Sequence, residues 1–152
     1  MAAVLVLFSS QRLPDIVASH FDSAGRPNGS MPRATYVGCM LLFTVGLPLL
    51  VVFSSRRALR NPHARINVPH AQFWLGHERR ASTVGYIMDA MAVFGSLLVT
   101  FLAYVNWLVV RANAQSPPLL PSAWFLCGLG AFFLATLVWI VRLVGHFRAI
   151  PP

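Results

Sequence analysis

The chain has 152 residues, of which 57% are hydrophobic and only 11% charged, and its formal net charge is +8. A soluble domain carries about 25% charged residues, so this composition excludes an ordinary soluble domain and indicates a membrane protein. No stretch between the apolar runs reaches the roughly 50 residues from which independent domains usually begin. We therefore expect a single membrane domain over residues 1–152.

The chain begins with a short apolar segment, Met1–Phe8. As a helix this segment would be about 12 Å long, which is less than half of a hydrocarbon core about 30 Å thick. It lacks the basic region and the small-residue cleavage site of a signal peptide. Three interpretations stay open: the remnant of a fourth span, a shallow interfacial segment, or a start site placed too late.

Residues 9–34 favour a compact, turn-rich cap. Ile16–Phe21 is suited to a short strand, because apolar and β-branched residues predominate in it. Asp22–Gly25 has Asp first and Gly fourth, a pattern typical of a type I turn. Arg26–Gly29 predicts a second turn directly after the first, so two stacked turns would build the cap.

His20 and Asp22 are the candidate chemical residues of this cap. In a strand, residues two apart point to the same face, where this pair could share a metal or form a hydrogen bond. We expect a His–Asp hydrogen bond that holds the turns, because two ligands do not make a metal site. No metal or other cofactor is expected.

Three long runs contain no Lys, Arg, Asp or Glu: Tyr36–Phe53, Met91–Val110 and Ala123–Val141. Each is long enough for a helix to cross the bilayer. Inside lipid every backbone N–H and C=O needs a partner within the chain, so these runs predict helices. The expected fold is an all-α, polytopic transmembrane bundle with three spans, at 36–53, 84–110 and 122–144.

The second and third spans carry faces suited to helix packing. Polar residues of the second span share one face with Trp107: Asp89, Ser96 and Thr100. Small residues recur at every fourth position of the third span: Ala123, Cys127, Ala131 and Ala135. Small residues at this spacing let helix backbones approach closely in lipid. We expect Ser96, Thr100 and this small-residue stripe to meet neighbouring helices.

Single residues inside the spans also carry predictions. Pro48 cannot donate to the carbonyl of Thr44, so it should kink the first span. Asn106 should hydrogen-bond between helices. Asp89 is a carboxylate near the end of its span, where a proton or ion role is the default hypothesis. We expect instead a structural pair with Arg79 or Arg80, or exposure at the interface.

Residues 54–83 form a basic loop. All twelve basic residues of the chain are Arg, and half of them lie in this loop: Arg56, Arg57, Arg60, Arg65, Arg79 and Arg80. Two more, Arg142 and Arg148, follow the third span. The positive-inside rule therefore places the loop and the C-terminus in the cytoplasm, and the cap at 9–34 outside. The expected location is a bacterial inner membrane, and topology explains the charge without a nucleic-acid partner.

The loop interleaves aromatic and charged residues: Phe73, Trp74, Glu78, Arg79 and Arg80. One interpretation is an interfacial segment, with rings at headgroup level and arginines on anionic lipid. The other is a docking surface for a cytoplasmic or membrane partner. Membrane lipids and other membrane protein subunits are the expected partners.

The cap resembles a known family. Leu13-Pro14-Asp15, His20-Phe21, Gly25 and Asn28-Gly29 resemble the signature of the bacterial membrane domain-of-unknown-function family numbered 1648. Later stretches resemble the tract that often follows in small members: Ile66–Pro69, Phe73–Leu75, Glu78–Arg80 and Arg111–Asn113. The resemblance spans about residues 11–115. Relatives typically have a full hydrophobic span before the leucine-proline motif, whereas here Met1–Phe8 precedes it.

The resemblance also implies a class of function. Larger relatives include the immunity and signalling protein for a sporulation-delaying toxin, which protects the producing cell and sequesters a repressor. A similar role here would use an external ligand at 13–30 and a partner at 56–80, without enzymatic activity. The alternative is an accessory or structural subunit packed into a larger membrane complex. The residues themselves contain no assembled catalytic constellation.

Overall fold

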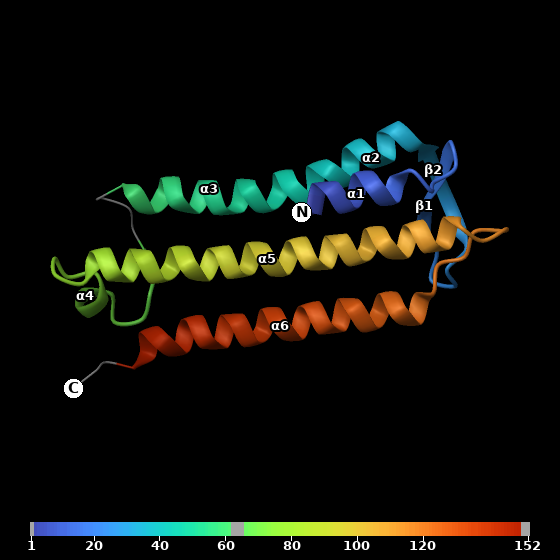
Figure 1. Cartoon of the computed structure of the whole chain (residues 1–152). Coiled ribbons are helices and arrows are strands. Elements are labelled where there is room, and N and C mark those ends of the chain that lie inside the picture. Colours follow the sequence, from blue (N-terminus) through green and yellow to red (C-terminus); the bar gives the residue numbers. More distant parts are fainter. Residues whose placement is uncertain (1, 62–65, 150–152) are drawn as a thin grey trace.

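The computed structural model describes residues 2–61 and 66–149 (Figure 1). Met1 and Arg65, which enter the predictions above, lie outside the described residues. The elements in chain order are α1 (Ala2–Ser10), β1 (Ile16–Phe21), β2 (Pro27–Pro32), α2 (Arg33–Leu41), the π-helical turn η1 (Leu42–Gly46), α3 (Leu47–Arg60), α4 (Ala71–Trp74), α5 (Arg80–Asn113) and α6 (Ser122–Arg148).

Among the described residues, three helices are long and apolar enough to cross a membrane, which confirms the predicted three-span architecture. The first, Arg33–Arg60, comprises α2, η1 and α3, and the others are α5 and α6. α5 packs against α3 on one side and against α6 on the other (Figure 1). We call the end with the β-strands the hairpin end, and the end with α4 the loop end.

The first span bends between α2 and α3, because α2 inclines away from the line of α3 (Figure 1). The five-residue π-helical turn, Leu42–Gly46, lies directly before Leu47 and Pro48. Because proline has no N–H and its ring crowds the preceding carbonyls, a wider turn accommodates it without ending the helix. The Thr44 hydroxyl is fully buried in this turn and has no hydrogen-bond partner.

The cap is an antiparallel β-hairpin, so the fold is mostly rather than entirely helical. β1 confirms the predicted strand, and the Gly25 N–H donates to the carbonyl of Asp22 at 3.0 Å, closing the predicted first turn. The predicted second turn is wrong, because Pro27–Pro32 forms β2 and His20 pairs with Gly29. Gly25 has φ +79°, a left-handed conformation that completes the chain reversal within one turn.

The buried core lies at the hairpin end, where α1, the hairpin, α2 and α5 meet. Its buried apolar residues are Val6, Leu13, Val17, Tyr36, Met40 and Val109. Asn106 links this core, since it accepts from the Tyr36 hydroxyl at 3.1 Å and donates to the Ser9 hydroxyl at 2.9 Å. This confirms the predicted role of Asn106 between helices.

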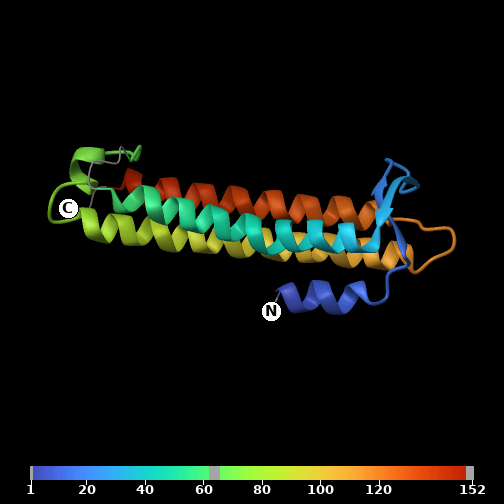
Figure 2. The same ribbon diagram turned by 90° about the horizontal axis from the view of Figure 1, so that it is seen from above.

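α1 is a short rod that ends part-way along the long helices (Figure 2). It packs against α2 and α5. Val6 is completely buried in the hairpin-end core, whereas Val4 and Phe8 are 66% and 63% exposed. The apolar start of the chain is therefore a half-length helix that docks one residue into the core and presents its other side outward.

Candidate functional site

A cleft of about 410 Å³ lies between the hairpin and the adjoining ends of α5 and α6. We call it the hairpin-end cleft. Ser19–Ser23 form its hairpin side, and the remaining lining residues are mostly apolar: Val105, Leu108, Val109, Leu120, Ser122, Phe125 and Leu126. The cleft thus combines a polar strand end with an apolar floor supplied by two membrane helices.

Asn113 fixes the hairpin above α5. Its Nδ2 donates to the carbonyl of Ala18 at 2.9 Å, and its Oδ1 accepts from the Ala18 N–H at 2.8 Å. The side-chain amide therefore pairs with β1 as a neighbouring strand would. Because both bonds involve one side chain and one backbone residue, the distance between strand and helix is closely defined.

Arg33 holds the segment that precedes β1. Its guanidinium donates to the carbonyl of Leu13 at 3.1 Å and forms an ion pair with Asp15 at 3.1 Å. The Arg33 N–H also donates to the carbonyl of Asp15 at 2.8 Å. The leucine-proline segment that leads into β1 is thereby attached to the first residue of α2.

Asp22 stabilises the turn of the hairpin. Its Oδ1 accepts from the N–H groups of Ala24 at 2.9 Å and Arg26 at 2.8 Å. Within the described part of the chain no hydrogen bond joins it to His20, so the predicted His–Asp hydrogen bond is wrong. The nearby backbone donors occupy the carboxylate instead, which is the usual behaviour of Asp at the start of a turn.

His20 and Ser19 are polar residues of β1 that line the cleft and whose side chains form no hydrogen bond with the turn. His20 is exposed and lies opposite Gly29, where a Cβ would come within 3.2 Å of the imidazole. The Ser19 hydroxyl is buried without a hydrogen-bond partner. No sequence signal marked Ser19, because its burial depends on how the hairpin docks onto the helices.

The described residues contain no group of three or more His, Cys, Asp or Glu side chains that could hold a metal. His20 and Asp22 both line the cleft, but Asp22 is already bonded to the turn. The arrangement is suited to binding an amphipathic ligand, with apolar groups on the helical floor and polar groups at the strand.

Residues 1–50 match the family described as Domain of unknown function (DUF1648). The match covers about a third of the chain. The matched segment includes α1, the hairpin, α2 and η1, and therefore contains the hairpin side of the cleft. No curated protein and no solved structure matches the chain significantly. The resemblance noted for residues beyond 50 stays a prediction.

The loop end of the molecule is closed by an aromatic cluster. The Trp74 Nε1 donates to the carbonyl of Phe147 at 3.0 Å, and its ring contacts the rings of Phe73, His146 and Phe147. Tyr86 stacks on His146 with centroids 3.8 Å apart. Phe73 and Trp74 were predicted to face headgroups or a partner. Trp74 instead attaches α4 to the end of α6, and Phe73 packs edge-on against Trp74.

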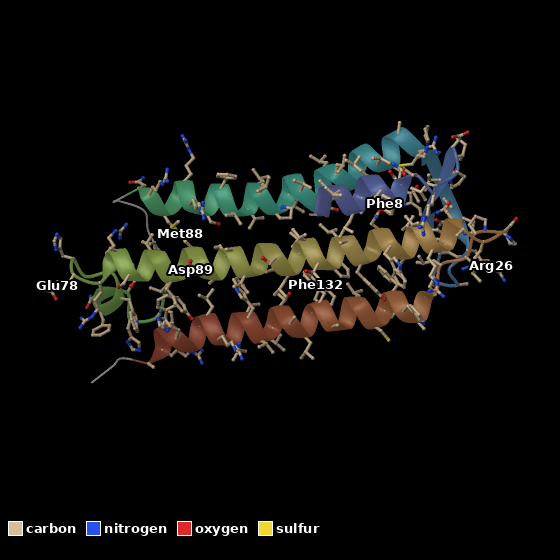
Figure 3. All side chains as sticks on the ribbon, in the orientation of Figure 1. Phe8, Arg26, Glu78, Met88, Asp89 and Phe132 are labelled. Carbon is tan, nitrogen blue, oxygen red and sulfur yellow. The ribbon has the colours of Figure 1, made fainter. Side chains whose placement is uncertain are left out.

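The charged residues next to this cluster are separated from Asp89. Arg79 lies over the Phe73 ring, 4.1 Å from its centroid, and Arg80 donates to the carbonyl of Asn61 at 3.1 Å. Glu78 is exposed at the tip of the loop end (Figure 3). Asp89 is nine residues beyond Arg80, about 13 Å along the helix, which explains why it pairs with neither arginine.

Ser96 and Thr100 do not bond to a neighbouring helix. Their hydroxyls donate within α5, to the carbonyls of Ala92 at 3.0 Å and Ser96 at 2.8 Å. Both line a groove between α3 and α5 together with Thr44 and Pro48. The predicted face is therefore next to the first span, but its polar groups are satisfied by their own helix.

A tight contact between α5 and α6 lies one residue away from the predicted small-residue stripe. A Cβ on Gly128 would fall on the ring of Tyr104, so only glycine permits this approach of α6 to α5. Ala123 and Cys127 are exposed, while Ala131 and Ala135 line grooves between the two helices. A search for small residues that includes glycine would have found Gly128 from sequence.

Proposed function

We propose that this DUF1648 protein is a non-enzymatic, multi-pass protein of the bacterial inner membrane that recognises an external ligand in an immunity or signalling role. The observation that carries the proposal is the hairpin-end cleft. Its volume of about 410 Å³ is within the range of about 300–1,000 Å³ that is common for ligand pockets. Its apolar floor and the unpartnered Ser19 hydroxyl favour an apolar peptide that carries hydrogen-bonding groups.

The distribution of arginines supports an outward-facing hairpin end. Seven arginines of the described chain lie at the loop end: Arg56, Arg57, Arg60, Arg79, Arg80, Arg142 and Arg148. The hairpin end holds four: Arg12, Arg26, Arg33 and Arg111. Of these, Arg33 is paired with Asp15, and Arg111 lies over the rings of Trp107 and Trp124. By the positive-inside rule the loop end faces the cytoplasm, where its arginines would contact anionic lipid.

A signalling role also requires a cytoplasmic contact. In this proposal the partner binds near the exposed residues Arg56 and Arg57 at the end of α3. Because α5 extends from the loop end to Asn113 beneath the hairpin, a ligand that shifted the hairpin would act on a helix that reaches both surfaces.

The proposal is tested by protection against membrane-active peptide toxins, including the sporulation-delaying toxin. Sensitive cells producing the wild-type protein should survive at least one toxin of the panel. His20→Ala and Ser19→Ala should reduce protection about tenfold, the effect of one lost polar contact of about 1.4 kcal/mol. Ser30→Ala, an exposed change on the other strand, is the matched control and should keep protection. Equal protection by all variants would reject the cleft as the binding site.

The alternative function is an accessory subunit, and the free surface of α6 favours it. α6 packs along α5 and, near its last turn, against α4, and none of its most apolar stretch is buried inside the chain. Ala123 and Cys127 on this surface are small enough for another helix to approach closely. Purification in mild detergent tests this function, since an accessory subunit should co-purify stoichiometrically with one large membrane complex.

A further inference from the structure

Another hollow lies towards the opposite end of the molecule from the hairpin-end cleft. It is a groove of about 660 Å³ between α5 and α6, which we call the α5–α6 groove. Most of its lining is apolar, with Val93 and Leu97 on α5 and Ala131, Ala135 and Val138 on α6. Two oppositely charged side chains, Asp89 and Arg142, also line it.

The two charges lie at the same height. Trp139 Nε1 donates to the carbonyl of Ala90 at 2.9 Å, which sets the register of the antiparallel helices. Arg142 follows Trp139 by three residues and therefore lies opposite the turn of α5 that contains Asp89. The stacked rings of Tyr86 and His146, 3.8 Å apart, show the same register one turn further on.

Asp89 and Arg142 lie at the same height along the two helices but do not form an ion pair with each other. Both side chains are exposed, and the ion pair between Arg33 and Asp15 is the only one formed within the described parts of the chain. A carboxylate next to the hydrocarbon core is most stable when a cation or a hydrogen-bond donor accompanies it. The groove thus offers an anion and a cation side by side, each open to a ligand.

The depth of this charge pair is that of the lipid headgroups. The uncharged runs Met91–Val110 and Ala123–Val141 are each about 30 Å long as helices, the thickness of the hydrocarbon core. Asp89 precedes the first run by two residues, and Arg142 directly follows the second. Both charges therefore lie at the boundary where acyl chains end and phosphates begin.

The groove continues from this boundary into the hydrocarbon region. An adjoining hollow of about 320 Å³ shares Leu97, Ala131 and Ala135 with the groove and extends to Tyr104 and Gly128. From Asp89 to Tyr104 the distance along α5 is about 22 Å. The small side chains of α6 thus leave an apolar channel that is long enough for much of an acyl chain.

We propose that the α5–α6 groove binds one membrane phospholipid whose headgroup carries both a phosphate and a primary ammonium, as in phosphatidylethanolamine. The phosphate binds Arg142, the ammonium donates to Asp89, and one acyl chain lies along Ala131 and Ala135. Charge complementarity favours this lipid over anionic lipids, which Asp89 repels, and over choline lipids, whose ammonium has no N–H to donate. The site is independent of the hairpin-end cleft.

The test is native mass spectrometry of the full-length protein in mild detergent, titrated with phosphatidylethanolamine, phosphatidylglycerol and phosphatidylcholine of identical acyl chains. The wild-type protein should bind phosphatidylethanolamine about tenfold more tightly than the other two, a difference of about 1.4 kcal/mol. Asp89→Asn should abolish this preference. Glu78→Gln removes an equal charge from the exposed loop-end tip and should leave the preference unchanged.

Two further variants separate headgroup from acyl-chain binding. Arg142→Gln should weaken all three lipids, because all of them carry a phosphate. Ala131→Leu should fill the groove and weaken all three several-fold while retaining the order of preference. The proposal is rejected if the wild-type protein binds the three lipids equally or if Asp89→Asn keeps the preference. It is also rejected if the groove is occupied by a second copy of the chain. In that case the wild-type protein would be a dimer, and Ala131→Leu would dissociate it.

Discussion

Replacing Gly128 by alanine tests a tight contact between α5 and α6. The added methyl group would fall on the ring of Tyr104, whose hydroxyl donates to the carbonyl of Trp124 at 2.7 Å. Overpacking of this kind costs about 1–3 kcal/mol, and the displaced hydrogen bond adds about 1 kcal/mol. The higher helix propensity of alanine offsets about 1 kcal/mol of this loss. Gly128→Ala should therefore lower the free energy of unfolding by about 1–3 kcal/mol.

Gly130 provides the matched control, because no atom lies within 4 Å of a Cβ built there. Gly130→Ala should leave stability unchanged or raise it by up to about 1 kcal/mol. Both variants are measured by reversible unfolding in detergent micelles. A double-mutant cycle with Tyr104→Ala should give a large coupling energy with Gly128 and none with Gly130. Equal stability of the two glycine variants would refute the contact.

Three further predictions concern the hairpin end and the loop end. Asn113→Ala should release the hairpin, because both hydrogen bonds to Ala18 are lost, and amide exchange in β1 should rise at least tenfold; unchanged exchange would contradict this attachment. Asp22→Asn should cost little, since its amide oxygen keeps the acceptor, whereas Asp22→Ala should cost about 1–2 kcal/mol in thermal unfolding. Trp74→Phe should destabilise the closure of α6 by about 1 kcal/mol through the lost bond to Phe147, seen as faster exchange in the last turn of α6.

The three spans could be predicted because the length and apolarity of a run are fixed by the bilayer rather than by tertiary contacts. Ile16–Phe21 was predictable as a strand for a similar local reason. Its partner was not, because Pro27, Gly29 and Pro32 all have low strand propensity. The pairing arises from the reversal at Gly25, which brings this segment beside β1.

Features that depend on the rotation of one helix against another were harder to predict. Spacing located small residues on α6, but the contact lies at Gly128, because Tyr104 of α5 sets which side of α6 faces inward. The bonds between Asn113 and Ala18 join positions 95 residues apart, and nothing local to either residue indicates them. The unpartnered hydroxyl of Ser19 follows from that docking and could not be predicted before it.

The most direct test of the proposed external ligand is the sidedness of the hairpin end. In a cysteine-free background, Ser30→Cys on the exposed side of β2 and Glu78→Cys at the loop-end tip are labelled in intact cells with a membrane-impermeant maleimide. We predict that position 30 is labelled in intact cells, and that position 78 is labelled only after the membrane is opened. Labelling of position 78 but not of position 30 in intact cells would place the cleft in the cytoplasm and contradict the proposed function.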